Sequence, residues 1–267
     1  MGIKLKALRD QTIVITGASS GIGLATAKMA AKEGANVVLV SRNEAILRQI
    51  HKGSLIAVAH LKGKGGAIIN LGSVESDISI PLQGMYAASK HAVKGYTDAL
   101  RMELEEEGAG ISVTLIKPSA LDTPFPQNAR NYLDEEPKLP PPVYNPEDAA
   151  MAIVHAAAHP KRDIYIGAGG KMFSSLNKHL PGVIETYNER IIVRQQTRGE
   201  APRNPEGALH QPNVGGRVRG DHPGFVMPRS IYTRASLHPV FTGVVLAAAG
   251  LAVAAWFARD KIDSYLS

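Results

Sequence analysis

The chain has 267 residues, enough for one large α/β domain or two small ones. Apolar residues make up 44% of it, which excludes a wholly disordered chain. Lys and Arg outnumber Asp and Glu by 30 to 24, but no basic cluster is dense enough to predict nucleic-acid binding, and an anionic cofactor would suit the mild excess. The absence of Cys excludes disulfides, thiolate metal sites and cysteine nucleophiles.

Short β-branched runs alternate with helical segments over the first 170 residues. Strands are expected at 12–16, 36–40, 67–71, 111–116 and 164–166. Helices are expected at 22–32, 42–50, 54–62, 85–107 and from Asn145 to before Pro160. This alternation predicts an α/β fold with a doubly wound parallel, Rossmann-like sheet.

A glycine-rich turn joins the first strand to the first helix. Glycine lets the backbone approach a pyrophosphate, and free N–H groups at the start of a helix bind its charge. The strand before the turn and the helix after it favour a dinucleotide site over a plain tight turn. The predicted cofactor-binding residues of this turn are Gly17, Ser19, Ser20, Gly21, Ile22 and Gly23.

The end of the second strand indicates which dinucleotide is bound. The sequence there reads Val40-Ser41-Arg42, 19 residues after Gly23, where a carboxylate would bind the ribose hydroxyls of NAD. A hydroxyl and a guanidinium suit a 2′-phosphate better, so we expect NADP rather than NAD, with Arg42 as a cofactor-binding residue. The alternative is that Arg42 begins a helix and faces water.

Ser73, Tyr86 and Lys90 form the predicted catalytic set. Tyr86 and Lys90 are four residues apart and lie on one face of a helix, and Ser73 follows the third strand. We expect the ammonium group to lower the pKa of the phenol, so that Tyr86 exchanges a proton with a carbonyl or alcohol oxygen, while Ser73 binds that oxygen. No metal is required. A Tyr–Lys pair alone would indicate an ordinary amphipathic surface, and it is the combination with Ser73 and the turn that favours catalysis.

Together these motifs resemble the short-chain dehydrogenase/reductase family over about residues 8–170. The elements that carry the resemblance are Gly17-x3-Gly21-x-Gly23, Ser73, Tyr86-x3-Lys90 and Pro118-Ser119-x3-Thr123. The resemblance implies that the Ser–Tyr–Lys set handles the proton and that Tyr86 and Lys90 also contact the cofactor. It further implies that Pro118, Ser119 and Thr123 lie against the nicotinamide carboxamide.

One part of the family pattern is missing. Only 24 residues separate Ser41 from Gly66, too few for the two strand–helix units that the family has there, since one βαβ unit needs about 30 residues. The missing part includes the family's Asn-Asn-Ala-Gly motif and its catalytic Asn, with the join near residues 49–52. If the gap closes, five strands remain in the order 2-1-3-4-5; if it stays open, strand edges are left unpaired.

Two further segments follow the predicted catalytic domain, which spans residues 1–197. Residues 198–238 hold five Pro and six Gly without helical or strand periodicity, so we expect a linker. Residues 239–258 contain the 18-residue uncharged run 240–257, about the length of a bilayer-spanning helix, and 259–267 form a tail. We expect a membrane-associated protein with a cytoplasmic catalytic domain. The alternatives are that this helix docks on the domain or forms a subunit contact in a homo-oligomer, and in either case the protein would be cytoplasmic.

The sequence therefore predicts an NADP-dependent oxidoreductase that moves a hydride between the nicotinamide and a small-molecule carbonyl or secondary alcohol. The rival hypothesis is a catalytically inert, nucleotide-binding, membrane-associated protein that has lost two strand–helix units but kept the motif residues. The missing strands favour the rival, and the intact Ser–Tyr–Lys set favours the enzyme.

Overall fold

The computed structural model describes residues 2–40, 56–208, 215–245, 247–248 and 250. The strands are β1 Thr12–Thr16, β2 Asn36–Val40, β3 Gly66–Leu71, β4 Ile111–Pro118, β5 Val143–Tyr144, β6 Asp163–Ile166 and β7 Val226–Met227. The helices are α1 Gly21–Lys32, α3 Gly84–Glu106, α4 Phe125–Asn128, α5 Pro146–Ala158, α6 Ala168–Asn177, α7 Pro181–Tyr187 and α8 Ile231–Leu237, with residues 56–61 also helical. Short 3₁₀ turns cover Leu8–Asp10, Val74–Ser76 and Val193–Gln195, and Asn188–Ile192 forms a π-helical turn.

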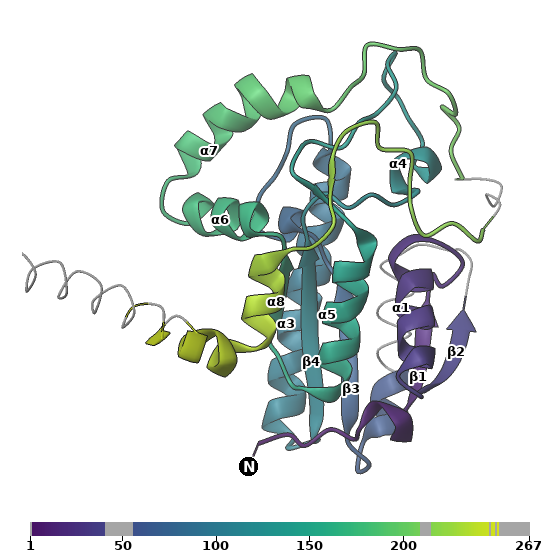
Figure 1. Ribbon diagram of the computed structural model, residues 1–267, viewed down its shortest axis with the longest axis vertical. Coiled ribbons are helices and arrows are strands. Elements are labelled where there is room, and N and C mark those ends of the chain that lie inside the picture. Colours follow the sequence, from purple (N-terminus) through teal and green to yellow (C-terminus); the bar gives the residue numbers. More distant parts are fainter. Residues whose placement is uncertain (1, 41–55, 209–214, 246, 249, 251–267) are drawn as a thin grey trace, which may run out of the picture.

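The five longer parallel strands form two separate sheets, and the two-residue strands β5 and β7 pair in a third. Within the described residues β1 pairs with β2, and β3, β4 and β6 form a second sheet in the order β3-β4-β6. The α/β, Rossmann-like prediction is thus confirmed. Because β1 does not pair with β3, the gap stays open, and the single five-stranded sheet expected on closure does not form. Figure 1 shows β1 and β2 standing apart from β3 and β4.

The open edge leaves apolar strand residues accessible to solvent. Val14 of β1 is 62% exposed and Leu39 of β2 is 57% exposed, whereas every residue of β4 is buried. Parallel strands are normally covered on both faces, so these exposures mark the place where the missing units would lie. The join near residues 49–52 is itself outside the described residues.

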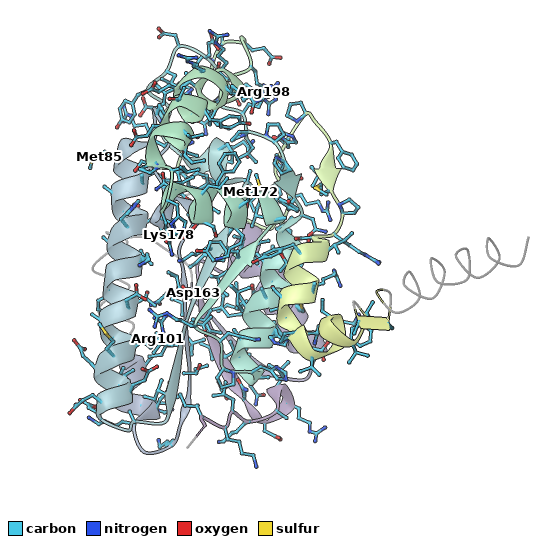
Figure 2. All side chains as sticks on the ribbon, turned by 90° about the vertical axis from the view of Figure 1, so that its left-hand side faces the viewer. Met85, Arg101, Asp163, Met172, Lys178 and Arg198 are labelled. Atoms are coloured by element: carbon cyan, nitrogen blue, oxygen red, sulfur yellow. The ribbon has the colours of Figure 1, made fainter. Side chains whose placement is uncertain are left out.

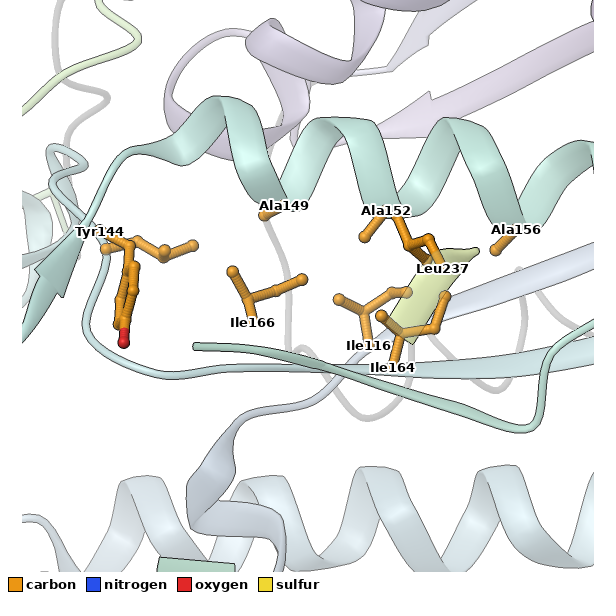
Figure 3. Close-up of a cluster of buried hydrophobic side chains, with 9 residues drawn as sticks. Ile116, Tyr144, Ala149, Ala152, Ala156, Ile164, Ile166 and Leu237 are labelled. Atoms are coloured by element: carbon orange, nitrogen blue, oxygen red, sulfur yellow. The ribbon is translucent and has the colours of Figure 1, made fainter. Parts of the chain in front are cut away.

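Helix α5 bridges the two sheets. Its N-cap is Asn145, whose side chain accepts a hydrogen bond from Asp148 N–H, as the Asn-Pro-Glu-Asp sequence predicts. Figure 3 shows three of its alanines, Ala149, Ala152 and Ala156, above Ile116, Ile164 and Ile166. Val154 lies on the other side of the helix, where it packs with Ala30 of α1. Because alanine lets backbones approach closely, one helix serves both sheets.

Helix α3 covers the opposite face of the β3-β4-β6 sheet. Its Leu100 and Leu104 pack with Ile68, Ile111 and Val113 of the strands. Figure 2 shows α3 running along one side of the molecule, with Met85 near its start, Arg101 further along and Asp163 on the neighbouring strand. Met85 is 86% exposed and lies away from the core.

The segment 198–238 contains regular structure that its composition did not predict. Its described part includes β7 and α8, and α8 is held by hydrogen bonds as well as by Leu237, which packs in the main core cluster. Ser230 caps α8 and donates its N–H to Asp148 at 2.5 Å, while the Thr233 hydroxyl accepts the N–H of Gly167 at 3.1 Å. Polar anchoring of this kind leaves no periodicity to read in the sequence.

The chain continues from α8 into the predicted apolar helix. Residues 239–245 are helical, and Val240 and Phe241 are 80% and 70% exposed, so they do not dock on the domain. In the ranges that the structure describes, no helix is both long enough and apolar enough to cross a bilayer. Residues 251–258 fall outside these ranges, so membrane association stays a prediction.

The two sheets lead to a matched pair of stability predictions. We expect Val14→Thr to change the free energy of unfolding by less than about 0.5 kcal/mol, because Val14 already faces solvent. Val113→Thr, which buries a hydroxyl where Val113 is 3% exposed, should cost about 1–3 kcal/mol. Urea unfolding of both variants measures these costs. Equal costs would show that β1 is buried in a closed sheet.

Candidate active site

The glycine turn has the geometry of a close backbone approach. Gly17 and Gly21 have φ of +69° and +53°, which favour glycine, and a Cβ on Gly23 would overlap the carbonyl of Gly17. Ser20 is the N-cap of α1, yet its side chain makes no capping hydrogen bond. The first turn of α1 is therefore not capped by its own N-cap side chain, as expected of a site that receives an anion. Ile22 packs against the main core cluster instead of facing the turn.

Residues 215–222, which we call the strap, lie directly on this turn. Gly216 N–H donates to the carbonyl of Ser19, and Gly21 N–H donates to the carbonyl of Arg217, both at 2.8 Å. The strap continues to Asp122, whose carboxylate accepts the N–H of His222 at 3.4 Å. One of the backbone donors of the predicted phosphate site is thus already used by the chain itself.

The loop after β4 brings the residues predicted to contact the nicotinamide carboxamide next to the glycine turn. Pro118 ends β4, and Ser119 N–H donates to Ile166 at 3.0 Å, which extends the pairing with β6. A Cβ on Gly21 would lie 3.4 Å from Cβ of Thr123. The turn and the Pro118–Thr123 loop are therefore in contact, although β1 and β3 do not pair.

Ser73, Tyr86 and Lys90 converge as the sequence predicts. Ser73 caps a 3₁₀ turn after β3, with its hydroxyl accepting Glu75 N–H at 3.1 Å, and it hydrogen-bonds the Tyr86 side chain. Lys90 donates to the carbonyl of Leu71 at 3.0 Å, and its Nζ lies 5.5 Å from the centre of the Tyr86 ring. The ring of Phe125 packs against Tyr86 with 5.5 Å between centroids. The opening of α3 and the end of β3 thus place a hydroxyl, a phenol and an ammonium together.

The expected fall in the pKa of Tyr86 is not seen. Burial raises this pKa to about 12, the hydrogen bond from Ser73 opposes the rise, and the negative charge of Glu75 adds to it. Lys90 lies over the ring and donates to Leu71 rather than to the phenol oxygen. Burial also lowers the pKa of Lys90 to about 8. At neutral pH Tyr86 is therefore a neutral proton donor.

Glu75 is a site residue that the sequence analysis missed. It is 6% exposed, and burial raises its pKa to about 8, while the charge of Lys90 and a hydrogen bond from the backbone of Ile80 act in the opposite direction. Its Oε2 atom is buried without a hydrogen-bond partner. Because acidic residues are mostly exposed, a buried Glu75 was not expected from the sequence. Its position two residues after Ser73 was the only sequence signal.

Two further points concern the phosphate ligand and metal binding. Arg42, the predicted ligand of the 2′-phosphate, lies outside the described residues. Among the described residues, no group of three His, Asp or Glu side chains could hold a metal ion.

Comparison with known proteins places the chain in a family. The family model described as short chain dehydrogenase matches residues 11–54 and, separately, 52–134. An uncharacterized oxidoreductase of Bacillus subtilis, YxnA, is 35% identical over an alignment that covers 97% of this chain and 93% of that protein. The chain belongs to the short-chain dehydrogenase family, whose members are oxidoreductase enzymes. The same alignment reaches into the strap and α8, because only 3% of the chain lies outside it.

The same comparisons support a missing internal segment. The family match breaks at residues 52–54, next to the join expected at 49–52. The alignment with YxnA has 336 positions, so at least 69 positions of that relative have no counterpart in the 267 residues here. Two strand–helix units of roughly 30 residues each account for most of this difference.

Two other similarities are more limited. A hydroxysteroid 11-beta-dehydrogenase 1-like protein of Xenopus tropicalis is 35% identical over 109 residues, which cover 41% of this chain and 36% of that protein. A short chain dehydrogenase from Burkholderia cenocepacia, solved in complex with NADP, has a TM-score of 0.54 at 18% identity and matches 70% of this chain and 99% of that chain. This structural likeness shows the fold.

The buried Glu75 predicts a specific dependence of stability on pH. Because its folded pKa lies above its usual 4.5, the folded state binds the proton more tightly, and the stabilising effect of protonation is lost as the pH rises toward 8. The contribution of Glu75 to the free energy of unfolding should therefore fall from pH 5 to 7.5, by up to about 1.4 kcal/mol per pH unit, while His155, whose pKa burial lowers to about 4, contributes in the opposite direction below about pH 6.5. Burial lowers the pKa of Lys90 in the folded state to about 8. The stability that is lost by burying its charge is therefore recovered only above that pH, where Lys90 is deprotonated.

Glu75→Gln should remove this slope in urea unfolding at pH 5, 6.5 and 7.5. Glu136→Gln is the matched control, because Glu136 is 5% exposed and accepts the N–H of Arg203 at 2.8 Å away from Tyr86. It should keep the slope of the unmodified protein. Identical slopes in all three proteins would show that Glu75 is not buried as described.

Proposed function

We propose that the protein is an NADP-dependent reductase of small-molecule carbonyl compounds. The observation that carries the proposal is the protonated Tyr86 held by Ser73 beside Lys90. A phenol with a pKa of about 12 carries its proton at neutral pH, which is the form that donates to a carbonyl oxygen. The same residues would accept the proton of a secondary alcohol in the reverse direction.

The residues of the turn fit a dinucleotide. Gly17, Gly21 and Gly23 leave no side chain in the way of the backbone, and the hydroxyl of Ser20 makes no capping bond. The pyrophosphate would lie against this turn, and the carboxamide against Pro118, Ser119 and Thr123. Ser119 Oγ is buried without a partner, which suits a group that receives an amide. When bound, the reduced nicotinamide supplies the hydride for the carbonyl carbon.

Two observations support NADP over NAD. The guanidinium of Arg42 follows β2, where the family places the group that contacts the adenosine ribose. The structurally similar Burkholderia cenocepacia enzyme was solved with NADP. Comparison of the Kd values for NADPH and NADH, in the protein and in Arg42→Ala, tests this choice.

The chain's own residues then have distinct roles. Ser73 would donate a hydrogen bond to the carbonyl oxygen, and Tyr86 would transfer its proton to the same oxygen as the alcohol forms. Lys90 would hold the ribose and replace the proton lost by Tyr86. Phe125 packs against the ring of Tyr86 and limits its movement.

The second candidate is a nucleotide-binding protein without turnover. It is favoured by the separation of the two sheets, because an error of about 1 Å in catalytic geometry can cost about 100-fold in rate. It is also favoured by the strap, which uses the N–H of Gly21. Both candidates bind the dinucleotide, so only turnover separates them.

Tyr86→Phe is the variant that separates the candidates. We expect it to lower the rate of NADPH oxidation with a panel of carbonyl compounds at least 100-fold, because the proton donor is lost. NADPH affinity, measured by fluorescence titration, should change less than about 3-fold. Retained NADPH binding with no turnover in the unmodified protein would support the second candidate.

The strap predicts an effect on cofactor affinity. Gly216 has φ of +95° and no neighbour within 4 Å of its Cβ position, so Gly216→Val strains the strap without a steric clash. Weakening the bond between Gly21 and Arg217 should free the N–H of Gly21 and tighten NADPH binding about 3–10-fold. The control is Gly199→Val, at φ of +71° with equally open space. An unchanged or weaker affinity would show that the strap does not compete with the cofactor.

We also infer an association of residues 239–258 with a membrane or with a second copy of the chain. The support is the 18-residue uncharged run and the exposure of Val240 and Phe241. Flotation with lipid vesicles and the mass in solution without lipid distinguish the two partners.

A further inference from the structure

An open cavity of about 630 Å³ lies between helix α1 and the strap, on a part of the molecule that the proposed reaction does not use. Figure 1 shows the strap passing beside the start of α1, where Gly21 N–H donates to the carbonyl of Arg217. The volume of the cavity falls in the range of about 300–1,000 Å³ that is typical of small-molecule sites. Ser73, Tyr86 and Lys90 do not line it, so it is distinct from the catalytic cluster.

Four cationic side chains and one acid line this cavity. The cations are Lys28 and Lys32 of α1 and Arg217 and Arg219 of the strap, and the acid is Glu147 of α5. The two lysines are four residues apart, so they lie on one face of α1. The cavity therefore has a clear excess of positive charge.

The arginines of the cavity have acidic partners, whereas the lysines do not. Arg219 donates to both carboxylate oxygens of Glu147 at 3.1 Å, and Arg217 pairs with Asp221. In the part of the chain that the structure describes, neither lysine side chain forms an ion pair or a hydrogen bond. Two unpaired like charges on one helix face repel each other, and a bound anion would relieve this repulsion.

Apolar side chains form the rest of the lining. Ala25 and Met29 come from the same face of α1 as the lysines, and Val218 comes from the strap. Ala25 is buried, and Met29 and Val218 are half-buried. The methylene stems of the lysines and arginines add further apolar surface. A bare inorganic anion would leave this surface unused, so the lining suits a molecule that has both an anionic head and an apolar chain.

We propose that the cavity binds a small amphipathic anion, whose carboxylate or phosphate head group is held by Lys28 and Lys32 and whose apolar chain lies against Met29 and Val218. Ammonium groups donate charge-assisted hydrogen bonds to such head groups. Because the cations come from both α1 and the strap, a bound head group bridges these two segments.

The backbone of Arg217 couples this cavity to the dinucleotide turn. Its side chain lines the cavity, and its carbonyl accepts the N–H of Gly21 at 2.8 Å. A ligand that holds the strap against α1 keeps this N–H occupied and weakens NADPH binding, and NADPH weakens the binding of the ligand by the same factor. The coupling rests on the proposed cofactor site, whereas the binding of the anion does not.

Calorimetric titration of the full chain with dodecanoate tests the site in the absence of NADPH. We expect saturable binding that weakens as NaCl rises from about 50 to 300 mM, because salt screens the ionic contacts. Acetate, which has only the head group, should bind at least about 10-fold more weakly, since no apolar chain is buried. Dodecyltrimethylammonium, which has the same chain with the opposite charge, should show the same loss.

The double variant Lys28→Gln with Lys32→Gln should raise the Kd for dodecanoate about 5–10-fold, because two exposed ionic contacts are lost. The matched control is Lys64→Gln with Lys178→Gln, which removes the same charge from exposed lysines that do not line the cavity. The control should bind dodecanoate as the unmodified protein does. All four positions are exposed, so thermal melts should show both double variants folded.

Titration with NADPH at saturating dodecanoate tests the coupling. In the unmodified protein we expect the Kd for NADPH to rise about 3–10-fold when dodecanoate is bound. In the double variant of Lys28 and Lys32, the same concentration of dodecanoate should have a smaller effect.

The outcomes separate the site from the proposed function. Equal dodecanoate affinity in the two double variants, or no saturable binding to the unmodified protein, overturns the site. Binding to phosphatidylglycerol vesicles that needs Lys28 and Lys32, without binding of free dodecanoate, assigns the lysines to a lipid surface and also overturns it. An unchanged Kd for NADPH refutes the coupling while the site stands. Failure of NADPH to bind at all contradicts the proposed function, and the dodecanoate titration still decides the site.

Discussion

The close packing of α5 between the β3-β4-β6 sheet and α1 is the contact on which the rest of the structure depends. In the described structure β1 and β3 share no hydrogen bonds, so the dinucleotide turn and the catalytic cluster are held together by other means. Helix α5 places Ala149, Ala152 and Ala156 on the β3-β4-β6 sheet and Val154 against α1. The side chain of Gln11, just before β1, also donates to the carbonyl of Ala157 at 2.8 Å. At the other end, Gly21 meets Thr123, and these contacts fix the turn relative to Tyr86.

This arrangement explains how the chain can lack two strand–helix units and still bring the predicted site residues together. Each functional group is placed by an element on the intact side: β3 carries Ser73 at its end, α3 carries Tyr86 and Lys90, and β4 leads to Thr123. The open edge leaves Val14 and Leu39 exposed instead of moving these groups. The cost therefore falls on the stability and solubility of the β1–β2 unit.

The chemistry of the cluster follows from burial more than from the Tyr–Lys contact. Three ionisable groups lie together with little water, so the pKa of Tyr86 and that of Glu75 rise while that of Lys90 falls. Tyr86 and Glu75 are thereby kept protonated below about pH 8. Such a site holds protons that it can give, as the proposed reduction of a carbonyl requires.

Local elements were largely predictable from the sequence, and long-range consequences were not. The bounds of β1 and β2 agree with the prediction, and those of α1 and α3 agree within one residue, because periodicity and capping are local. Asn145 caps α5 as expected. The failure of β1 to pair with β3 depends on how two helices pack, which no local pattern encodes. The rise in the pKa of Tyr86 and the burial of Glu75 depend on how deeply these side chains lie in the folded protein. The strap is held by backbone hydrogen bonds, which carry no sequence signature.

The most direct test of this account is a crystal structure of the protein grown with NADPH. The account predicts two separate parallel sheets joined by α5, with the side chains of Ser73 and Tyr86 hydrogen-bonded and Gly21 next to Thr123. A continuous sheet in which β1 pairs with β3, or a Tyr86 side chain turned away from Ser73, would contradict it.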